Sequence, residues 1–358
     1  MNAGPKRFAK VLLGQALVRS GLWKRTLRRW AERDAVIILT YHRVIEKWDE
    51  TLDYSQPGMV VTASTFERQV AILKEHFEVV RLSALLADEN TARRSARPRC
   101  VVTFDDGWRD NHDLAFPILR RHDVPATIYL TTDFIGTNRA FWHTTLMYLL
   151  THPNLASLLS DERAFRAYPD PVRHHLKRLA TLDGAAGAHD LDPLIETVKA
   201  LCDDDAIEEL VYSFTNAAGI SKPLDRKVFL DWDQVRTMAA AGIEIGSHGC
   251  SHRTMTKLPA ERADDELIRS KAEIERRVGR KVKHFAFPYE DASGPLLTAA
   301  ANAGYRTACV GGSVAGHGPF GIQSLRRLGM AEEVCSDGRS FDEALLHYWL
   351  FRAPTGPA

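Results

Sequence analysis

Short apolar runs alternate with helical patterns along most of the chain. A continuous apolar run of roughly four to eight residues is typical of a strand that a parallel sheet buries on both faces. Between such runs, apolar residues recur at helical spacing, as at Phe66, Val70 and Leu73. The pattern predicts a distorted (β/α) barrel of the (β/α)7 type. The runs expected to form strands are 36–39, 77–80, 100–104, 126–130, 243–246, 283–287 and 305–310.

Two segments depart from this alternation. From about residue 141 to 225 the strand pattern gives way to Leu-, Ala- and Asp/Glu-rich stretches broken by prolines, which predicts a helical insertion. The barrel domain is expected to span residues 34–330 with this insertion, and a helical C-terminal tail is expected over 331–358.

Residues 1–33 form a separate basic arm. Nine Lys and Arg residues stand against the single acid Glu32, and apolar residues such as Phe8 and Trp23 are interleaved with them. The arm has two interpretations: a basic amphipathic helix on an anionic membrane surface, or a helix docked on the domain with solvated charges. The longest nearly apolar run, 11–18, is far below the ~20 residues that span a bilayer and makes a poor secretory signal. We therefore expect a cytoplasmic location, with any lipid contact at the inner membrane surface.

The overall composition excludes several classes of protein. Hydrophobic residues make up 45% and charged residues 26% of the chain, which is ordinary for a globular protein and rules out intrinsic disorder. With 47 basic and 46 acidic residues, the chain lacks the charge excess typical of nucleic-acid binding, so no nucleic-acid partner is expected. Five scattered cysteines without a Cys-x-x-Cys pair argue against a disulfide framework.

Chemically active residues follow the predicted strands. His42 follows the first strand, and Asp105 and Asp106, then His248 and His252, follow later ones. In parallel β/α folds the chemistry lies at the carboxyl ends of the strands. We therefore expect these side chains to meet at one end of the barrel.

His248 and His252 have the spacing of a metal site. Two neutral imidazoles four residues apart, joined by one carboxylate, are a ligand set typical of catalytic zinc, which keeps an open position for water. One of the adjacent carboxylates, Asp105 or Asp106, can bind the metal while the other remains free as a base. The alternative is that one acid caps the following helix and the histidines are solvated.

Several segments resemble a known enzyme family. Thr103–Gly107 and Ser247–His252 resemble the first two motifs of the polysaccharide deacetylases of carbohydrate esterase family 4, the NodB-type domain. Pro125–Thr127 and Phe285–Tyr289 resemble further segments of that family. The resemblance covers most of residues 34–330 apart from the insertion, and it implies a NodB-like barrel with deacetylase activity.

The resemblance implies a role for each matching residue. Asp106, His248 and His252 would bind a divalent metal, usually Zn²⁺, and Asp105 would be the general base that takes a proton from the attacking water. The backbone N–H of Tyr289 would help to hold the oxyanion. The residues expected to contact the sugar are Pro288, Trp142 and Trp232.

The general acid is expected at an unusual position in the chain. The commonest family members carry it on a His near the C-terminus, in a Leu-x-His segment that this sequence lacks. Instead, an apolar strand ending in His42 opens the domain, which resembles the permuted branch of poly-N-acetylglucosamine deacetylases. Because the first and last strands of a closed barrel are neighbours, His42 is the predicted general acid. The alternative is a structural His bonded to a backbone carbonyl.

One residue of the family pattern is missing. The third motif places an Arg three residues before the Tyr, where it pairs with the catalytic Asp, but this position is Ala286. Either Arg109, Arg326 or Arg327 takes its place, or Asp105 is tuned by the metal alone.

Taken together, the motifs predict a metal-dependent hydrolase that removes N-acetyl groups from amino sugars in a polysaccharide, an oligosaccharide or a lipid-linked glycan precursor. One alternative is an O-acetyl esterase or a deformylase acting on a related saccharide. Another is a carbohydrate-binding domain without turnover, although the complete Asp/Asp/His/His set argues against it.

Overall fold

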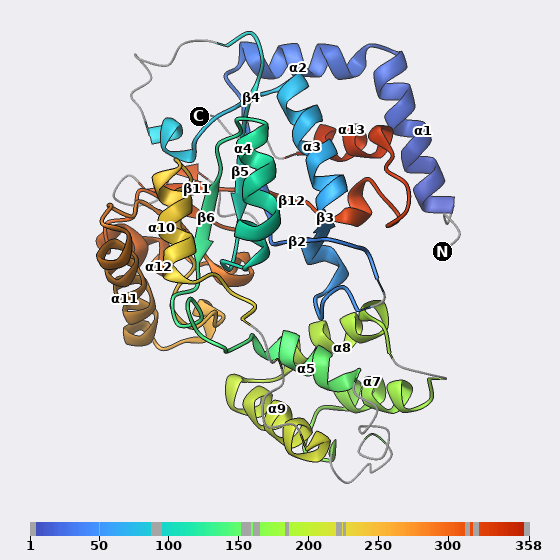
Figure 1. Cartoon of the computed structure of the whole chain (residues 1–358), viewed down its shortest axis with the longest axis vertical. Coiled ribbons are helices and arrows are strands. Elements are labelled where there is room, and N and C mark those ends of the chain that lie inside the picture. Colours follow the sequence, from blue (N-terminus) through green and yellow to red (C-terminus); the bar gives the residue numbers. More distant parts are fainter. Residues whose placement is uncertain are drawn as a thin grey trace.

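The architecture combines a curved sheet wrapped by helices, a group of helices at one end, and a helical N-terminal arm (Figure 1). It comes from a computed structural model. The structure describes residues 5–49, 51–86, 95–151, 159, 165–182, 186–219, 224, 227–311, 316–317 and 322–353.

The main sheet is parallel except at its β10 edge. Its strands are β1 (Val36–Tyr41), β4 (Glu78–Val79), β5 (Arg99–Phe104), β6 (Thr127–Leu130), β7 (Glu244–Ser247), β8 (His284–Ala286), β9 (Thr307–Cys309), β10 (Gly316–His317), β11 (Gln323–Leu325) and β12 (Leu328–Gly329). The order is β10-β11-β9-β8-β7-β6-β5-β1-β12, with β4 paired to the start of β5. A separate parallel pair is formed by β2 (Arg43–Ile45) and β3 (Val60–Thr62).

One stretch of chain joins the two edges of the sheet. β11 pairs with β9. After two intervening residues the chain forms β12, which pairs with β1. The first and last strands are therefore neighbours, as the placement of His42 required. The predicted distorted (β/α) barrel is confirmed.

The strands form at the predicted apolar runs, and helices cover them. All of β1 and nearly all of β5 are buried, as expected for parallel strands that are covered on both faces. Local signals fix the helix ends: Asp231 and Gln234 form a capping box at α10, and Gly279 ends α11 in the left-handed conformation. The surrounding helices are α3 (Ala63–His76), α4 (Phe116–Arg121), α10 (Trp232–Ala240), α11 (Ala260–Val278) and α12 (Gly294–Asn302).

Between β6 and β7 the described chain is helical and has its own hydrophobic cluster. Leu146, Leu194 and Phe214 are fully buried in this cluster, and Ile45 and Val60 join it from the β2–β3 pair. These contacts attach the helices to the rest of the molecule (Figure 1). The exact limits of the insertion stay a prediction. Its described helices are α5 (Trp142–Leu150), α7 (Asp170–Ala180), α8 (Ala188–Leu201) and α9 (Asp204–Ala218).

The N-terminal arm is docked on the rest of the molecule, and its contact with a membrane stays a prediction. It consists of α1 (Pro5–Arg19) and α2 (Leu22–Glu32), and α1 packs against the C-terminal helix α13 (Glu343–Phe351). On α2, Trp23 is buried against His76 and His347. No described helix combines the length and apolar character required to cross a bilayer.

Candidate active site

The predicted catalytic residues converge at the carboxyl ends of the strands. Asp105 and Asp106 follow β5, and His248 follows β7. His42 stands between β1 and β2, so that its side chain comes within 3.9 Å of Asp105, measured from Nε2 to Oδ2. His252 completes the group from the turn after β7. Segments more than a hundred residues apart in sequence therefore form one site.

Asp106, His248 and His252 form a buried three-ligand cluster. The Oδ1 atom of Asp106 lies 3.4 Å from Nε2 of His248 and 3.1 Å from Nε2 of His252. One ligand atom from each residue falls within 4.8 Å of the others. Their arrangement fits a catalytic metal site with three protein ligands, a type of site that keeps a further position for water.

The hydrogen bonds around the cluster orient its ligand atoms. Nδ1 of His248 lies 2.7 Å from the carbonyl oxygen of Ala286 and donates to it, which turns the Nε2 lone pair toward Asp106. Oδ2 of Asp106 accepts from the indole N–H of Trp108 at 2.7 Å, whereas the buried Oδ1 has no hydrogen-bond partner. A buried carboxylate oxygen without a donor is costly, and a cation at this point would satisfy it. The residues therefore fit a divalent metal.

The chain adopts left-handed backbone conformations at three site residues. Asp106 has φ 75°, His252 has φ 59° and Tyr289 has φ 59°. Such conformations cost non-glycine residues of order 1–3 kcal/mol each and gather at functional sites. The turn at Asp106 lets two consecutive carboxylates serve different neighbours: Asp106 faces the histidines, and Asp105 faces an arginine.

That arginine is Arg327, which takes the place of the missing family arginine. Its Nη1 and Nη2 atoms donate to the two carboxylate oxygens of Asp105 at 2.7 and 2.6 Å, and its side chain is fully buried. The other two candidates are elsewhere, since Arg109 pairs with Asp113 and Arg326 is exposed. The cation therefore comes from the connection between β11 and β12 instead of the Ala286 position.

Electrostatics favour the charged form of both carboxylates. Burial alone would raise the pKa of Asp105, but the Arg327 guanidinium, together with His248 and His42, outweighs burial, and that pKa is lowered from its usual value. Burial would likewise raise the pKa of Asp106, yet His252 and His248 hold it well below its usual value. Both acids are thus ready to act as acceptors or ligands at neutral pH.

Tyr289 and Trp142 border a cavity beside the cluster. The cavity has a volume of about 540 Å³ and lies between the metal-ligand turn and helices α8 and α9, with His252 in its lining. The Tyr289 ring packs edge-on against His252. Pro288 is buried at the start of the turn that carries Tyr289. The insertion therefore helps to shape the space next to the cluster.

Trp232 lies apart from the residues that surround the cluster. It begins α10, stacks below the guanidinium of Arg277 from α11, and borders Gly136. It is absent from the described lining of the cavity that Tyr289 and Trp142 share. The prediction that Trp232 forms a wall of the groove therefore finds no contact to support it.

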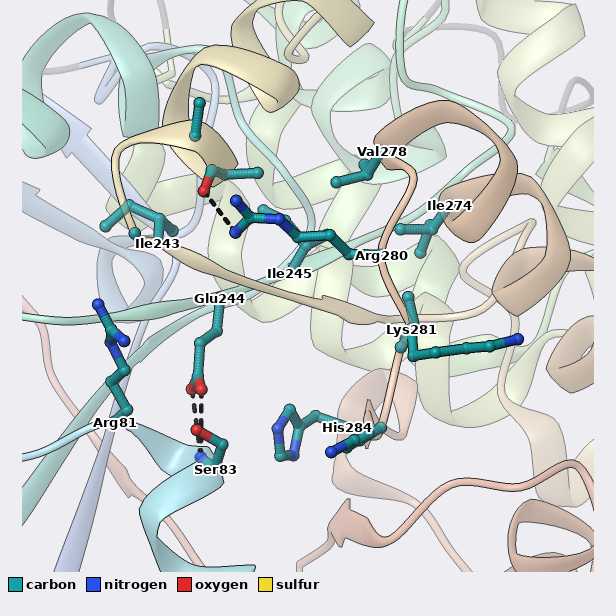
Figure 2. A pocket seen from close by; sticks show the side chains of 15 residues that line it. Arg81, Ser83, Ile243, Glu244, Ile245, Ile274, Val278, Arg280, Lys281 and His284 are labelled. Carbon is teal, nitrogen blue, oxygen red and sulfur yellow. Dashed lines mark hydrogen bonds between the residues drawn. The ribbon is translucent and has the colours of Figure 1, made fainter.

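A second cavity, of about 430 Å³, lies at the opposite end of the barrel, where β7 and β8 begin. Figure 2 shows the side chains that line it. Its lining comes from the start of β7, including Glu244, and from the segment leading into β8, including Lys281. Glu244 accepts from the backbone N–H of Ser83, and Arg280 donates to the carbonyl oxygen of Ala239. None of the cluster residues lines it. The predicted catalytic residues lie at the other end of the barrel.

Residues 92–179 and 197–308 match the sequence pattern of the polysaccharide deacetylase family. The chain belongs to this family. A deacetylase is a hydrolase, so the predicted enzyme class is confirmed at the level of the family. The matched segments contain Asp105, Asp106, His248 and His252. The two other residues at the site, His42 and Arg327, lie outside the matched segments and reach the site through the pairing of β1 with β12.

This polysaccharide deacetylase is similar to several named deacetylases. The poly-beta-1,6-N-acetyl-D-glucosamine N-deacetylase of Staphylococcus epidermidis is 29% identical over 115 residues, which are 30% of this chain and 39% of that protein. The deacetylase PplD of Streptococcus pyogenes, solved in complex with acetate, superposes with a TM-score of 0.52 at 15% identity, over 88% of this chain and 98% of that one. A polysaccharide deacetylase from Bacillus cereus gives 0.50 at 15% identity, over 88% and 69%. At these identities the solved structures show a shared fold.

Three further residues of the site were not predicted from the sequence. Trp108 holds Asp106, Phe141 stacks on the His252 ring at 4.2 Å between centroids, and His143 is buried nearby. Burial lowers the pKa of His143 to about 3, so this side chain is neutral. Of these three, only Trp108 could have been suspected from the sequence, because it stands two residues after the predicted metal ligand Asp106.

Proposed function

We propose that the chain is a metal-dependent N-deacetylase that hydrolyses the acetamide group of an N-acetylated amino sugar in a polysaccharide, an oligosaccharide or a lipid-linked precursor. The observation that carries the proposal is a buried Asp/His/His ligand set with a second carboxylate, Asp105, beside it. The activity named for the Staphylococcus epidermidis relative supports the amide of N-acetylglucosamine as the bond that is cleaved. We expect zinc as the metal.

The residues divide the work of amide hydrolysis. A divalent metal held by Asp106, His248 and His252 would supply a Lewis acid that polarises the acetyl carbonyl and makes water a better nucleophile. Asp105, kept as a carboxylate by Arg327, accepts the proton of the attacking water.

The leaving amine needs a proton, and His42 would give it. Its side chain is 26% exposed, and its Nε2 atom lies 3.9 Å from Oδ2 of Asp105. An amine is a poor leaving group unless it is protonated as it departs, so a general acid at this point speeds the reaction. The backbone N–H of Tyr289 would hold the developing oxyanion from the opposite side of the cluster.

The sugar would occupy the cavity of about 540 Å³ beside His252. Aromatic side chains are suited to the apolar face of a sugar ring, and Trp142 and Tyr289 offer two of them. The lining also includes Lys199 and Lys257, which can donate to hydroxyl groups. The insertion would therefore select the saccharide while the strand ends carry out the chemistry.

Metal removal tests the proposal. Treatment of the purified protein with a chelator is expected to reduce acetate release from N-acetylglucosamine oligomers to background, because the three buried ligands then hold no Lewis acid. Addition of Zn²⁺ should restore it. Full activity in the metal-free protein would reject the metal-dependent mechanism, and saccharide binding without acetate release under any metal would indicate a binding domain.

Substitution His42→Ala tests the general acid and the bond type together. We expect amide hydrolysis to fall by about 10²–10⁴-fold, because the amine leaves unprotonated. Hydrolysis of an acetyl ester of the same sugar should fall less, since an alkoxide is a better leaving group. Rates on the two substrates measure this, with exposed His174→Ala as the control. An equal loss on both would assign His42 a structural role, and activity on the ester alone would favour the esterase alternative.

A further inference from the structure

Most large hydrophobic side chains that remain exposed among the described residues lie on the N-terminal arm. Phe8, Leu12 and Leu13 are 61%, 49% and 51% exposed. The other exposed ones, on α8, α9 and α11, are isolated from one another in sequence. A soluble surface helix normally turns its apolar side toward the core. The gathering of exposed apolar side chains on this arm therefore calls for an explanation. We define the arm strip as Phe8, Leu12 and Leu13 of α1.

The contact with α13 fixes which side of α1 faces outward. Gly14 is buried there, and a Cβ at this position would lie 1.9 Å from the carbonyl oxygen of Ala344. Arg7 donates from nearly the same side to the carbonyl oxygen of Ser336 at 3.0 Å. At 3.6 residues per turn, this setting directs Phe8, Leu12 and Leu13 away from the barrel. The packing of α1 on α13 therefore leaves these apolar side chains exposed instead of burying them.

Unpaired cations border the arm strip. Lys6 and Lys10 lie beside it on α1, Arg19 lies at the end of that helix, and Lys24 and Arg25 begin the exposed side of α2. Each of these five side chains is exposed, and none has an acidic partner within salt-bridge distance in the part of the chain that the structure describes. Their charge is therefore available to an outside partner.

We infer that the arm strip docks on a membrane surface that contains anionic lipid. The apolar side chains would enter the boundary between headgroups and acyl chains, and the cations would contact the anionic headgroups. A second copy of this chain fits less well, because pairing two arm strips would bring two sets of cations together. Helices α1 and α2 lie along two adjoining outer edges of the molecule (Figure 1). The inference stands independently of the proposed reaction.

Vesicle co-sedimentation of the full chain tests the inference. The wild type is expected to bind vesicles of phosphatidylcholine with phosphatidylglycerol and to bind pure phosphatidylcholine much more weakly. The double variant Phe8→Ser/Leu12→Ser should bind the anionic vesicles at least about tenfold more weakly, because it removes two apolar side chains from the contact. The matched control is Ile268→Ser, which changes a side chain that is 57% exposed on α11 and should bind like the wild type.

Two companion measurements keep the outcomes distinct. Circular dichroism should be the same for the wild type and both variants, since the substituted side chains are exposed. Failure of the wild type to bind anionic vesicles, or equal binding by the double variant, would overturn the inference. Sedimentation velocity without lipid gives the remaining outcome: self-association that disappears in the double variant would replace the membrane by a second copy of the chain.

Discussion

Replacement of Asp105 by asparagine is expected to reduce acetate release by roughly 10²–10⁴-fold, the usual contribution of a general base. The amide of asparagine keeps the size of the side chain but cannot accept the proton of the attacking water. The ligand atoms of Asp106, His248 and His252 are untouched, so the metal content should stay that of the wild type. Initial rates on N-acetylglucosamine oligomers, together with elemental analysis of the same samples, measure both effects.

A nearby acid provides the control for this substitution. Asp113 lies on the turn after the Asp pair, pairs with Arg109 and is partly exposed, so Asp113→Asn should leave the rate within about twofold. If Asp105→Asn stayed within tenfold of the wild-type rate, Asp105 would not be the base. Loss of metal in this variant would instead make Asp105 a ligand.

Replacement of Arg327 by methionine is expected to affect both stability and activity. The side chain is fully buried, and its removal would leave the Asp105 carboxylate buried without its partner, which costs about 3–5 kcal/mol. Without the guanidinium, the pKa of Asp105 would rise, so the fall in activity on the acid side should move to higher pH. Chemical unfolding and a pH–rate profile report these two effects separately.

The double variant Arg327→Met/Asp105→Asn separates the ion pair from general packing. It should recover much of the lost stability, because no uncompensated charge remains, while activity stays low. Arg326→Met, at the exposed neighbouring position, is expected to change neither property. A stability of Arg327→Met equal to that of the wild type would contradict the role of this pair.

The parts of the site that local sequence determines could be predicted. The apolar runs of β1 and β5 identify buried strands, and the residues that directly follow them must emerge at one end of a parallel sheet. That is why Asp105, Asp106 and His42 were expected together. The pairing of β1 with β12 also agrees with the neighbouring first and last strands on which the choice of His42 depended.

Tertiary contacts determine the rest. Arg327 is 222 residues from Asp105 in sequence, and only barrel closure between β11 and β12 brings them together, so three arginines remained possible before the structure. Phe141 reaches His252 because the chain after β6 folds back over the ligand turn. Trp232 was a candidate because of a loose match to the family, and its neighbours turn out to be Gly136 and Arg277.

Titration of Zn²⁺ into metal-free protein tests the central claim most directly. The wild type and Asp105→Asn should each bind one equivalent with similar affinity. His248→Ala and His252→Ala should bind at least about 100-fold more weakly, since even supporting residues of metal sites are worth 10–100-fold in affinity. Wild-type affinity in both histidine variants, with circular dichroism showing that they are folded, would mean that these side chains do not hold a metal.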